Sequence, residues 1–294
     1  MTHSQLATDK AAIQLVLPDN GQDPNFQTGS IFFVGNATTI IRYGGFTILT
    51  DPNFLHQGEH VHLGYGLRSA RRTNPAMELE DLPPIDFVLL SHMHEDHFDR
   101  VVEQKLNKDL PILTTHEAAR KLAQKGFRAT YGLRHWEQRT IVKGDAQLQL
   151  SAMPGRHGPP FLASLLPCVN GSLLEFQRPG DRPPFRLYIS GDTLMHQPLE
   201  EIPKRYPNID LALIHLGGTK ILGVLLTMDA KQGVQAVQLI APRVAIPIHF
   251  NDYTVMKSPL SDFVKAAEAA QLKTEIQVLE HGDEYTFDVL SNQE

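Results

Sequence analysis

The chain has 294 residues, of which 41% are hydrophobic and 20% are charged, and its formal net charge is −6. A chain of this length can bury a large core, and its acidic balance argues against non-specific nucleic-acid binding, which needs a basic face. No apolar run reaches the roughly 18 residues of a membrane span, and the first residues carry no secretory signal. We therefore expect a cytoplasmic protein with no nucleic-acid partner and no stable membrane anchor.

Residues 1–28 are polar and irregular, and we interpret them as an N-terminal arm that precedes a single domain over 29–294. Branched and aromatic residues then predict three short strands, at Ile31–Val34, Thr38–Tyr43 and Phe46–Thr50. The Gly44-Gly45 pair between the last two is typical of a two-residue hairpin loop. Residues 55–84 contain Gly, Pro and Arg with little periodicity, which indicates a long loop.

The middle of the chain alternates strands with helices. A nearly continuous apolar run, Ile85–Leu90, predicts a strand that is buried on both faces. A helix is expected from about Arg100 to Asn107, and a second over 115–125, between a capping box at Thr114–Glu117 and Gly126. Further strands are predicted near 139–143, 147–152, 171–177, 185–190 and 210–215.

The last part of the chain follows the same pattern. Apolar spacing predicts a helix over roughly 228–240, and Val244–Ile248 reads as another buried strand. Ser258-Pro259 is a suitable start for a helix to about 271, and strands near 275–279 and 285–289 follow. Strands dominate and helices occur in each half, so the pattern predicts an α+β fold of two packed sheets with helices outside.

The densest group of potential metal ligands is His92-x-His94-x-Asp96-His97, directly after the buried strand. Residues i and i+2 of an extended chain point the same way, so His92 and His94 can approach one metal ion together. A turn after His94 would direct Asp96 and His97 to a second point nearby. Polar groups at the end of a buried strand cost free energy unless they are paired or bound. Cys168 is the only cysteine, which excludes a thiolate cage and leaves imidazole and carboxylate as ligands.

The segment Leu89–His97 resembles the signature of metallo-β-lactamase-fold hydrolases. Four further motifs occur in the order found in that family: Thr50-Asp51-Pro52, Gly155-Arg156-His157-Gly158, Ser190-Gly191-Asp192-Thr193 and Ile246-Pro247-Ile248-His249-Phe250. The resemblance covers about 30–280 and implies a four-layer αβ/βα sandwich of two mixed sheets. Leu82–Asp86 is also similar to N-acyl-phosphatidylethanolamine phospholipase D, whose branch includes ascorbate-6-phosphate lactonase. Asn36 stands where relatives often have a histidine.

The resemblance implies two metal ions. Its ligand positions assign His92, His94 and His157 to the first ion, Asp96, His97 and His249 to the second, and Asp192 as a bridge between them. Nitrogen and oxygen donors suit zinc, and manganese or iron are also acceptable. Asp51 is expected to form hydrogen bonds near the site rather than to bind metal.

The function implied is a binuclear hydrolase in which a metal-bridging hydroxide attacks a phosphodiester, ester or lactone, with Asp96 orienting the nucleophile and accepting its proton. His215 would contact substrate or be a buried, hydrogen-bonded histidine. Arg68, Arg71 and Arg72 would bind a small-molecule substrate if it is anionic, or be solvated loop residues. An iron-dependent oxidoreductase on the same fold and a non-catalytic metal-binding protein are the alternatives. A homo-oligomer is compatible with the sequence.

Overall fold

The predicted hairpin around Gly44-Gly45 is present in the computed structural model, which describes residues 14–19, 21, 23–64, 66–162, 165–180 and 182–289. β3 (Thr38–Tyr43) pairs with β4 (Phe46–Thr50), so that Tyr43 lies opposite Phe46. Gly44 and Gly45 have φ angles of 59° and 86°. A two-residue turn with both φ angles positive fits the twist of the flanking strands, and glycine adopts it at little cost.

This hairpin belongs to a seven-stranded sheet whose order, among the described strands, is β19-β2-β3-β4-β7-β8-β9. The other members are β2 (Thr28–Gly35), β7 (Phe87–Leu89), β8 (Ile112–Thr115), β9 (Thr130–Leu133) and β19 (Glu284–Asp288). Neighbouring strands from β4 to β9 run parallel. β19 comes last in the chain yet pairs antiparallel with β2 at the sheet edge, so the first sheet is mixed and is completed by the C-terminal strand.

The second sheet has eight described strands, in the order β1-β10-β11-β12-β13-β14-β17-β18. They are β1 (Gln14–Val16), β10 (Gln138–Lys143), β11 (Ala146–Pro154), β12 (Asn170–Phe176), β13 (Phe185–Ile189), β14 (Leu211–His215), β17 (Val244–Ile248) and β18 (Glu275–Ile276). β1 lies within the range interpreted as an irregular arm; three residues paired with β10 are too short to leave a periodic signal. Residues 1–13 of that arm lie outside the described residues.

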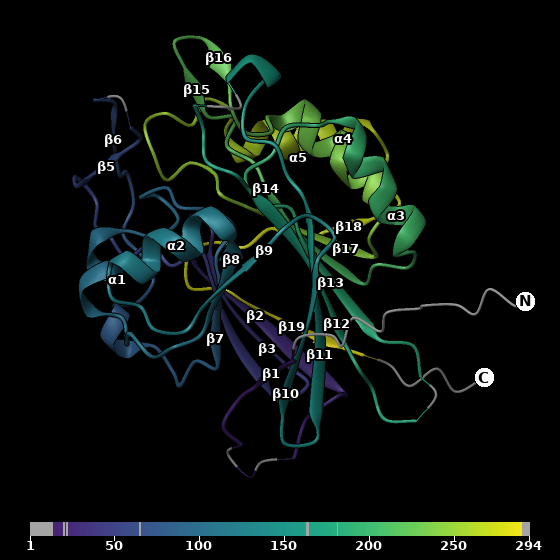
Figure 1. The fold of residues 1–294 in the computed structure, drawn as a ribbon. Helices are drawn as coiled ribbons and strands as arrows, with labels where there is room; N and C mark the ends of the chain where they lie inside the picture. The colour runs from purple at the N-terminus through teal and green to yellow at the C-terminus, as the bar shows by residue number, and fades with distance from the viewer. Residues whose placement is uncertain are drawn as a thin grey trace, which may run out of the picture.

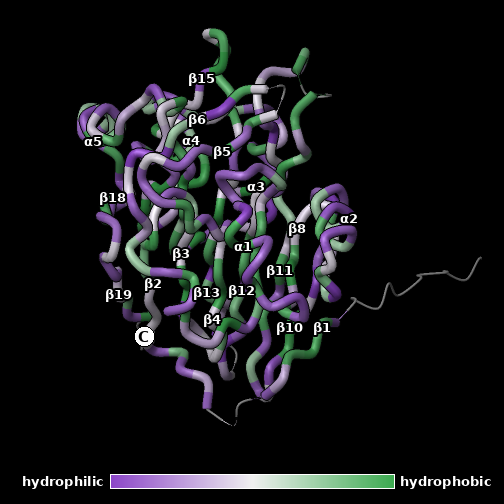
Figure 2. Tube along the Cα trace, turned by 90° about the vertical axis from the view of Figure 1, so that its left-hand side faces the viewer, coloured by the Kyte–Doolittle hydropathy of each residue, from purple (hydrophilic) through white to green (hydrophobic). Residues whose placement is uncertain are grey.

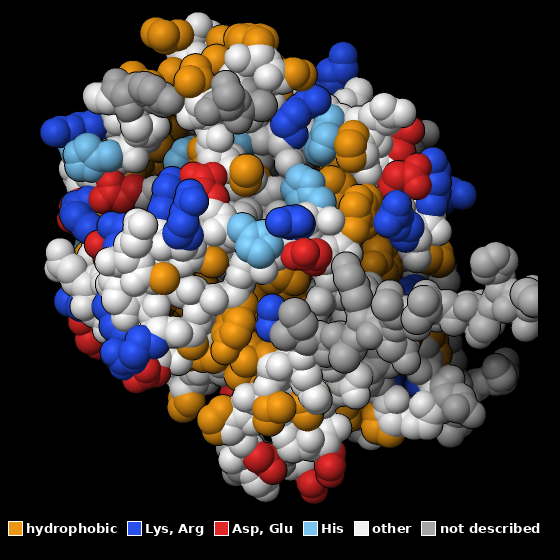
Figure 3. Space-filling view, in the orientation of Figure 1, with side chains coloured by type: hydrophobic (Ala, Val, Ile, Leu, Met, Phe, Trp, Pro, Cys, Tyr) orange, Lys and Arg blue, Asp and Glu red, His pale blue; other side chains and the backbone are white. Residues whose placement is uncertain are grey.

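Helices cover the outer face of each sheet (Figure 1). They are α1 (Arg100–Lys105), α2 (His116–Gln124), α3 (Glu201–Arg205), α4 (Ala230–Ile240) and α5 (Leu260–Ala269). One hydrophobic cluster lies between the sheets, a second joins the first sheet to α1 and α2, and a third joins the second sheet to α3, α4 and α5. Figure 2 shows hydrophobic segments along the strands in the middle of the molecule, whereas Figure 3 shows basic and acidic side chains interspersed on one face of the surface. The predicted α+β, four-layer αβ/βα class is thereby confirmed.

Two expectations need correction. Residues 55–84 are not one loop, since they contain the hairpin of β5 (His60–His62) and β6 (Arg68–Ala70) and a 3-10 helix at Leu79–Asp81. Val61 anchors this hairpin in a small buried cluster, but its alternation spans only three residues. Ser258 does not cap α5, because its hydroxyl accepts a hydrogen bond from the Ala230 backbone at the start of α4.

Shorter elements complete the described chain. β15 (Lys220–Ile221) and β16 (Val224–Leu225) form a two-stranded hairpin, and 3-10 helices lie at Pro160–Leu162 and Gln197–Glu200. The longest described helix, α4, has 11 residues, and none of these helices combines the length and the hydropathy that crossing a bilayer requires.

Candidate metal centre

The candidate site is built where parallel strands of both sheets end. In the first sheet, Asp51 follows β4 and the turn His92–His97 follows β7. In the second sheet, Asp192 follows β13, His215 ends β14 and His249 follows β17, while His157 comes after β11. The carboxyl ends of neighbouring parallel strands lie at one edge of a sheet, where ligands bind in many α/β proteins. Each sheet therefore contributes part of the site.

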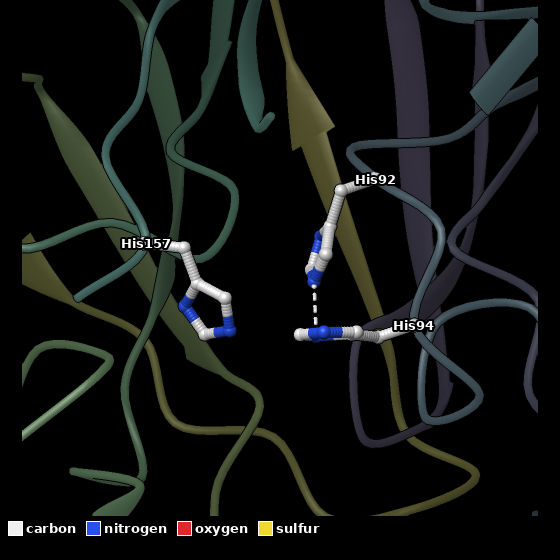
Figure 4. A group of neighbouring side chains, drawn as sticks. All are labelled: His92, His94 and His157. Carbon is white, nitrogen blue, oxygen red and sulfur yellow. Dashed lines mark hydrogen bonds between the residues drawn. The ribbon is translucent and has the colours of Figure 1, made fainter. Parts of the chain in front are cut away.

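His92, His94 and His157 form the first group, which we call the imidazole group (Figure 4). His92 Nε2 and His94 Nδ1 are 3.0 Å apart, and the ring centre of His157 lies 5.3 Å from that of His92 and 5.0 Å from that of His94. In Figure 4 the His157 ring faces the other two from the opposite side. His157 Nδ1 is 3.1 Å from the Leu226 carbonyl oxygen, so that carbonyl orients the ring and leaves Nε2 free to bind.

Asp96, His97, Asp192 and His249 form the second group, which we call the carboxylate group. His97 Nε2 lies 3.2 Å from Asp192 Oδ2, and His249 Nε2 lies 3.4 Å from Asp96 Oδ2. All four side chains are buried. The two groups adjoin, since the ring centres of His92 and His97 are 4.2 Å apart. The structure therefore brings together all seven residues that the sequence predicted as metal ligands.

Two backbone positions in the left-handed region place ligands of the carboxylate group. Gly191 has a φ angle of 62°, and a Cβ there would lie 2.7 Å from the Asn170 carbonyl oxygen, so glycine is required beside Asp192. His249 itself has a φ angle of 58°, a conformation that costs a non-glycine residue roughly 1–3 kcal/mol. Its backbone N–H donates to the Asn36 carbonyl at 2.6 Å. Strain held at a ligand in this way is typical of functional sites.

Asp51 and Asp99 fix the 92–97 turn without joining either group. Asp51 accepts hydrogen bonds from the Ser91 backbone at 2.7 Å and the Ser91 hydroxyl at 2.8 Å, and its Oδ2 is 3.0 Å from His97 Nδ1. These contacts confirm the hydrogen-bonding role expected for Asp51. Asp99 caps α1 through the backbone of Val101 and Val102 and also accepts from Leu55 at 2.9 Å. Both ends of the turn are therefore held by buried carboxylates.

Asn36 is a supporting residue whose role the sequence did not reveal. Its side-chain amide donates to the Asp96 carbonyl at 2.6 Å, and its backbone N–H donates to Asp252 at 3.0 Å. Because its own carbonyl accepts from His249, Asn36 ties together the two chain segments that carry Asp96 and His249. Its φ angle of 53° is one that asparagine tolerates better than most residues, and this preference is the signal that could have pointed to it.

Burial and charge act differently on the two groups. Burial lowers the pKa of His92 and His157, and, with His157 nearby, it lowers that of His94 to about 3. Burial would also lower the pKa of His97 and His249, but neighbouring carboxylates, Asp192 first, raise both. The imidazole group is therefore neutral, the state in which histidine binds metal, whereas the carboxylate group carries compensating charges.

The side chains fit a pair of cations. Among the described residues, Asp96 Oδ1, His97 Nε2 and Asp192 Oδ1 are buried side-chain atoms with no hydrogen-bond partner. A buried, unsatisfied polar atom costs about 1–3 kcal/mol, and more if it is charged, so three of them in one site need an external partner. All the donors are imidazole or carboxylate, a set that suits zinc, manganese and iron. The donor chemistry and the atoms that lack a hydrogen-bond partner therefore both favour bound cations.

Of the other predicted residues, His215 lies beside the carboxylate group, where it forms a further cluster with Asp51 and His97, whereas the three arginines lie outside both groups. His215 is 1% exposed, with Nδ1 3.3 Å from the Ser190 hydroxyl and Nε2 3.4 Å from Asp51, which fits a buried, hydrogen-bonded histidine better than a substrate contact. Arg71 is 2% exposed, contacts Asn53 and lies over the Tyr253 ring. It is therefore neither a solvated loop residue nor placed to bind a substrate. Arg68 and Arg72 are exposed on and beside β6.

Comparison with known protein families identifies the superfamily. A family model described as the beta-lactamase superfamily domain matches residues 47–250, which include every residue of both groups. The chain belongs to the beta-lactamase superfamily. It is 28% identical over 266 residues to the UPF0173 protein YddR of Bacillus subtilis, which spans 86% of this chain and 98% of that protein. It is also 27% identical over 193 residues to a UPF0173 metal-dependent hydrolase of Nanoarchaeum equitans, covering 65% of this chain and 81% of the relative.

Solved structures agree with this superfamily at the level of the fold. An isothiocyanate hydrolase from Delia radicum gut bacteria has a TM-score of 0.76 at 20% identity, covering 89% of this chain and 100% of the other. CmlA, a diiron β-hydroxylase from Streptomyces venezuelae, has a TM-score of 0.62 at 18% identity, covering 90% of this chain and 55% of CmlA. The predicted enzyme class, a metal-dependent hydrolase of this superfamily, agrees with the names of the relatives.

Proposed function

We propose that this protein is a binuclear metal-dependent hydrolase whose two cations are bound at the imidazole and carboxylate groups. His92, His94 and His157 would hold one cation, and Asp96, His97 and His249 the other. Asp192 would serve both, because it contacts His97 and His249 and its charge also acts on His92. The observation that supports this most is the set of three buried side-chain donor atoms in one site that have no hydrogen-bond partner.

When bound, two such cations supply Lewis acidity to a substrate oxygen and lower the pKa of a water molecule toward neutrality. The protein's own contribution is to fix the donors and exclude bulk water, since all the carboxylate-group side chains are buried. We assign to Asp96 the orientation of the attacking water and the acceptance of its proton, because its Oδ1 has no other partner among the described residues. The Ser91 hydroxyl donates to Asp51 and the Ser190 hydroxyl contacts His215. Both hydroxyls therefore already have partners, and we assign no serine nucleophile.

The bond hydrolysed would be an ester, lactone or phosphodiester. Placement in the branch of N-acyl-phosphatidylethanolamine phospholipase D and ascorbate-6-phosphate lactonase remains a prediction that rests on residues 82–97. Screening metal-loaded protein against carboxylic esters, lactones, phosphodiesters and isothiocyanates would identify the bond. The last class is included because a protein of the same fold is named for it.

The decisive experiment joins metal content to turnover. We expect close to two ions of zinc, manganese or iron per chain by elemental analysis, and Asp96→Ala should abolish hydrolysis while leaving the fold intact by circular dichroism. Asp229→Ala is the matched control, because Asp229 caps α4 through Gln232 at 3.0 Å and lies outside both groups. Metal-replete protein that binds no ion, or Asp96→Ala protein with full turnover, would contradict the proposal.

An iron-dependent oxidoreductase is the second candidate, because a diiron β-hydroxylase shares the fold. This chain corresponds to only about half of that enzyme. Iron reconstitution followed by oxygen-consumption measurements separates the two functions: a hydrolase consumes no oxygen with any substrate of the panel. A non-catalytic metal-binding protein would bind two ions and turn over nothing.

A further inference from the structure

A cavity of about 590 Å³ opens beside His94, on the imidazole side of the site. Four segments line it: the turn that carries His94, the β5–β6 hairpin, helix α2, and residues 165–168. His94 is the ligand candidate that belongs to both the cavity wall and the imidazole group. A substrate whose reacting carbon or phosphorus lies at the metal centre would therefore extend its remaining atoms into this cavity.

One side of the cavity is apolar. Leu63, Met93, Leu166 and Pro167 contribute to it, and Leu166 packs next to Gly158, the neighbour of His157. A Cβ built on Gly158, the residue after His157, would lie 2.7 Å from Leu166 Cδ1.

Each charged residue of the cavity lies beside a group that can carry the opposite charge. Glu95 lies 2.8 Å from His62 and 3.0 Å from Arg100, and Lys121 donates to Glu117 at 2.6 Å. The described lining residues include two carboxylates, Glu95 and Glu117, and one ammonium group, Lys121. Arg68 in β6 and Arg71 just after it do not line the cavity. A second anionic group on a substrate would thus meet no cation without an acidic partner.

We propose, on the basis of the proposed function, that this cavity binds an uncharged apolar group, an alkyl or aryl chain of several carbons, and that the substrates are neutral esters or lactones rather than phosphate-bearing anions. The metal centre would act on the polar end of the substrate. Leu63, Met93 and Leu166 would select its other end by burial of apolar surface, at on the order of a two- to fourfold gain in kcat/KM per buried methylene.

Two 4-nitrophenyl esters of equal chain length provide the test. In 4-nitrophenyl octanoate the chain ends in a methyl group, and in the mono-4-nitrophenyl ester of suberic acid it ends in a carboxylate. In both, water adds to the carbonyl carbon, the bond between the acyl carbon and the 4-nitrophenyl oxygen breaks, and a carboxylic acid and 4-nitrophenol form, the latter losing its proton to the buffer to give coloured 4-nitrophenolate. We expect kcat/KM to be at least about tenfold higher for the octanoate, and to rise from acetate through butyrate to octanoate.

The Leu166→Gln variant tests the apolar side of the cavity directly. It should raise KM for the octanoate about fivefold or more, with a smaller effect on KM for the acetate, whose single methyl group buries less apolar surface. Leu222→Gln is the matched control, because Leu222 lies in the turn of the β15–β16 hairpin, is 95% exposed and does not line the cavity. Lys121→Gln should leave both octanoate and suberate kinetics unchanged. A suberate ester turned over as well as the octanoate, or one weakened selectively by Lys121→Gln, would overturn the proposal.

A binding measurement keeps the proposal testable if the proposed function fails. Octyl 4-nitrophenyl ether and its ω-carboxylate cannot be hydrolysed as esters, and calorimetric titration gives their affinities for the metal-loaded protein. Tighter binding of the neutral ether, weakened by Leu166→Gln, would support the cavity assignment even if no ester is turned over. Equal or tighter binding of the carboxylate would reject it, whatever the outcome of the hydrolysis assays.

Discussion

The imidazole group and the carboxylate group lie side by side but differ in charge. His92, His94 and His157 are neutral because burial outweighs every other effect on their pKa values. The carboxylate group holds Asp96 and Asp192, which keep the pKa values of its two histidines raised. A cation entering the first group meets neutral donors, whereas a cation entering the second meets negative charge. Two sites of unequal affinity can therefore be built from neighbouring turns.

Removing Asp192 should have the largest effect. The Asp192→Ala variant takes away the carboxylate that contacts both His97 and His249, and we expect kcat/KM to fall by roughly 10³-fold or more, with loss of metal. Steady-state kinetics and elemental analysis measure the two effects. If Asp192→Ala keeps two ions per chain, the carboxylate is not shared between the groups.

The unequal affinity can be tested ligand by ligand. At 4 Å and an effective dielectric constant of 20, a carboxylate attracts a unit positive charge by about 4 kcal/mol, so the carboxylate group should bind its ion first. Calorimetric titration of metal-free protein should show two phases at least about tenfold apart. His249→Ala should remove the tighter phase and His157→Ala the weaker one. A single phase in which two ions bind with equal affinity would contradict the predicted difference between the two groups.

Asn36 should matter for one group and not for the other. The Asn36→Ala variant removes the amide that holds the Asp96 carbonyl, and outer hydrogen-bond partners of metal ligands typically contribute 10–100-fold in affinity. We expect the tighter phase of the titration to weaken by roughly that factor and the weaker phase to remain. Asn36→His is the informative second variant, because an imidazole replaces the amide that donates to the Asp96 carbonyl. Equal weakening of both phases would indicate a general loss of structure.

The smallest effect concerns the ion pair of His281 and Asp252, in which Asp252 accepts a hydrogen bond from Asn36. His281 Nε2 lies 3.2 Å from Asp252, whose other oxygen accepts from Asn36. Burial disfavours the charged form of both residues. Their mutual contact nevertheless raises the pKa of His281 and lowers the pKa of Asp252, although Arg71 partly opposes the rise at His281. The stability gained from His281 is complete below its unfolded pKa of about 6.5 and is lost as pH rises through the folded value. The stability gained from Asp252 is present above about pH 4 and is lost as pH falls through its folded pKa.

His281→Ala should therefore lower the free energy of unfolding by about 1–2 kcal/mol at pH 5.5 and by less at pH 9. Urea denaturation of wild type and variant at the two pH values measures the difference. His56→Ala is the control, because His56 contacts Glu78 on the surface with about half of its side chain exposed and should contribute little at either pH. A larger loss at pH 9 than at pH 5.5 would contradict the assignment.

The sequence indicated the four ligands of the 92–97 turn because they follow a strongly apolar strand, and such strands are recognisable without a structure. The turn 92–97 is local, so its geometry follows from spacing. His157, Asp192 and His249 were placed through the family resemblance, since no spacing rule relates residues 60 to 160 positions apart. Helices α1, α2, α4 and α5 were expected close to where they occur, because amphipathic spacing and caps mark them.

What the sequence could not supply were contacts between distant segments. Arg71 looked like a surface cation because nothing in its neighbourhood reveals that Asn53 and Tyr253 enclose it. Ser258 looked like the cap of the helix that follows it, yet its partner is Ala230 in another helix. β1 and the β5–β6 hairpin were missed because strands of three residues show no periodicity. In each case tertiary packing, not local preference, decides the outcome.

The pairing of β19 with β2 has a consequence for how the protein is made. Five residues near the C-terminal end, Glu284–Asp288, lie against Thr28–Phe32. During synthesis the edge of β2 has no strand to pair with until ribosomes have translated the chain beyond Asp288. The first sheet can therefore close only after residues 284–288 have been translated, and a transcript truncated before Glu284 would yield a protein with an open, aggregation-prone edge.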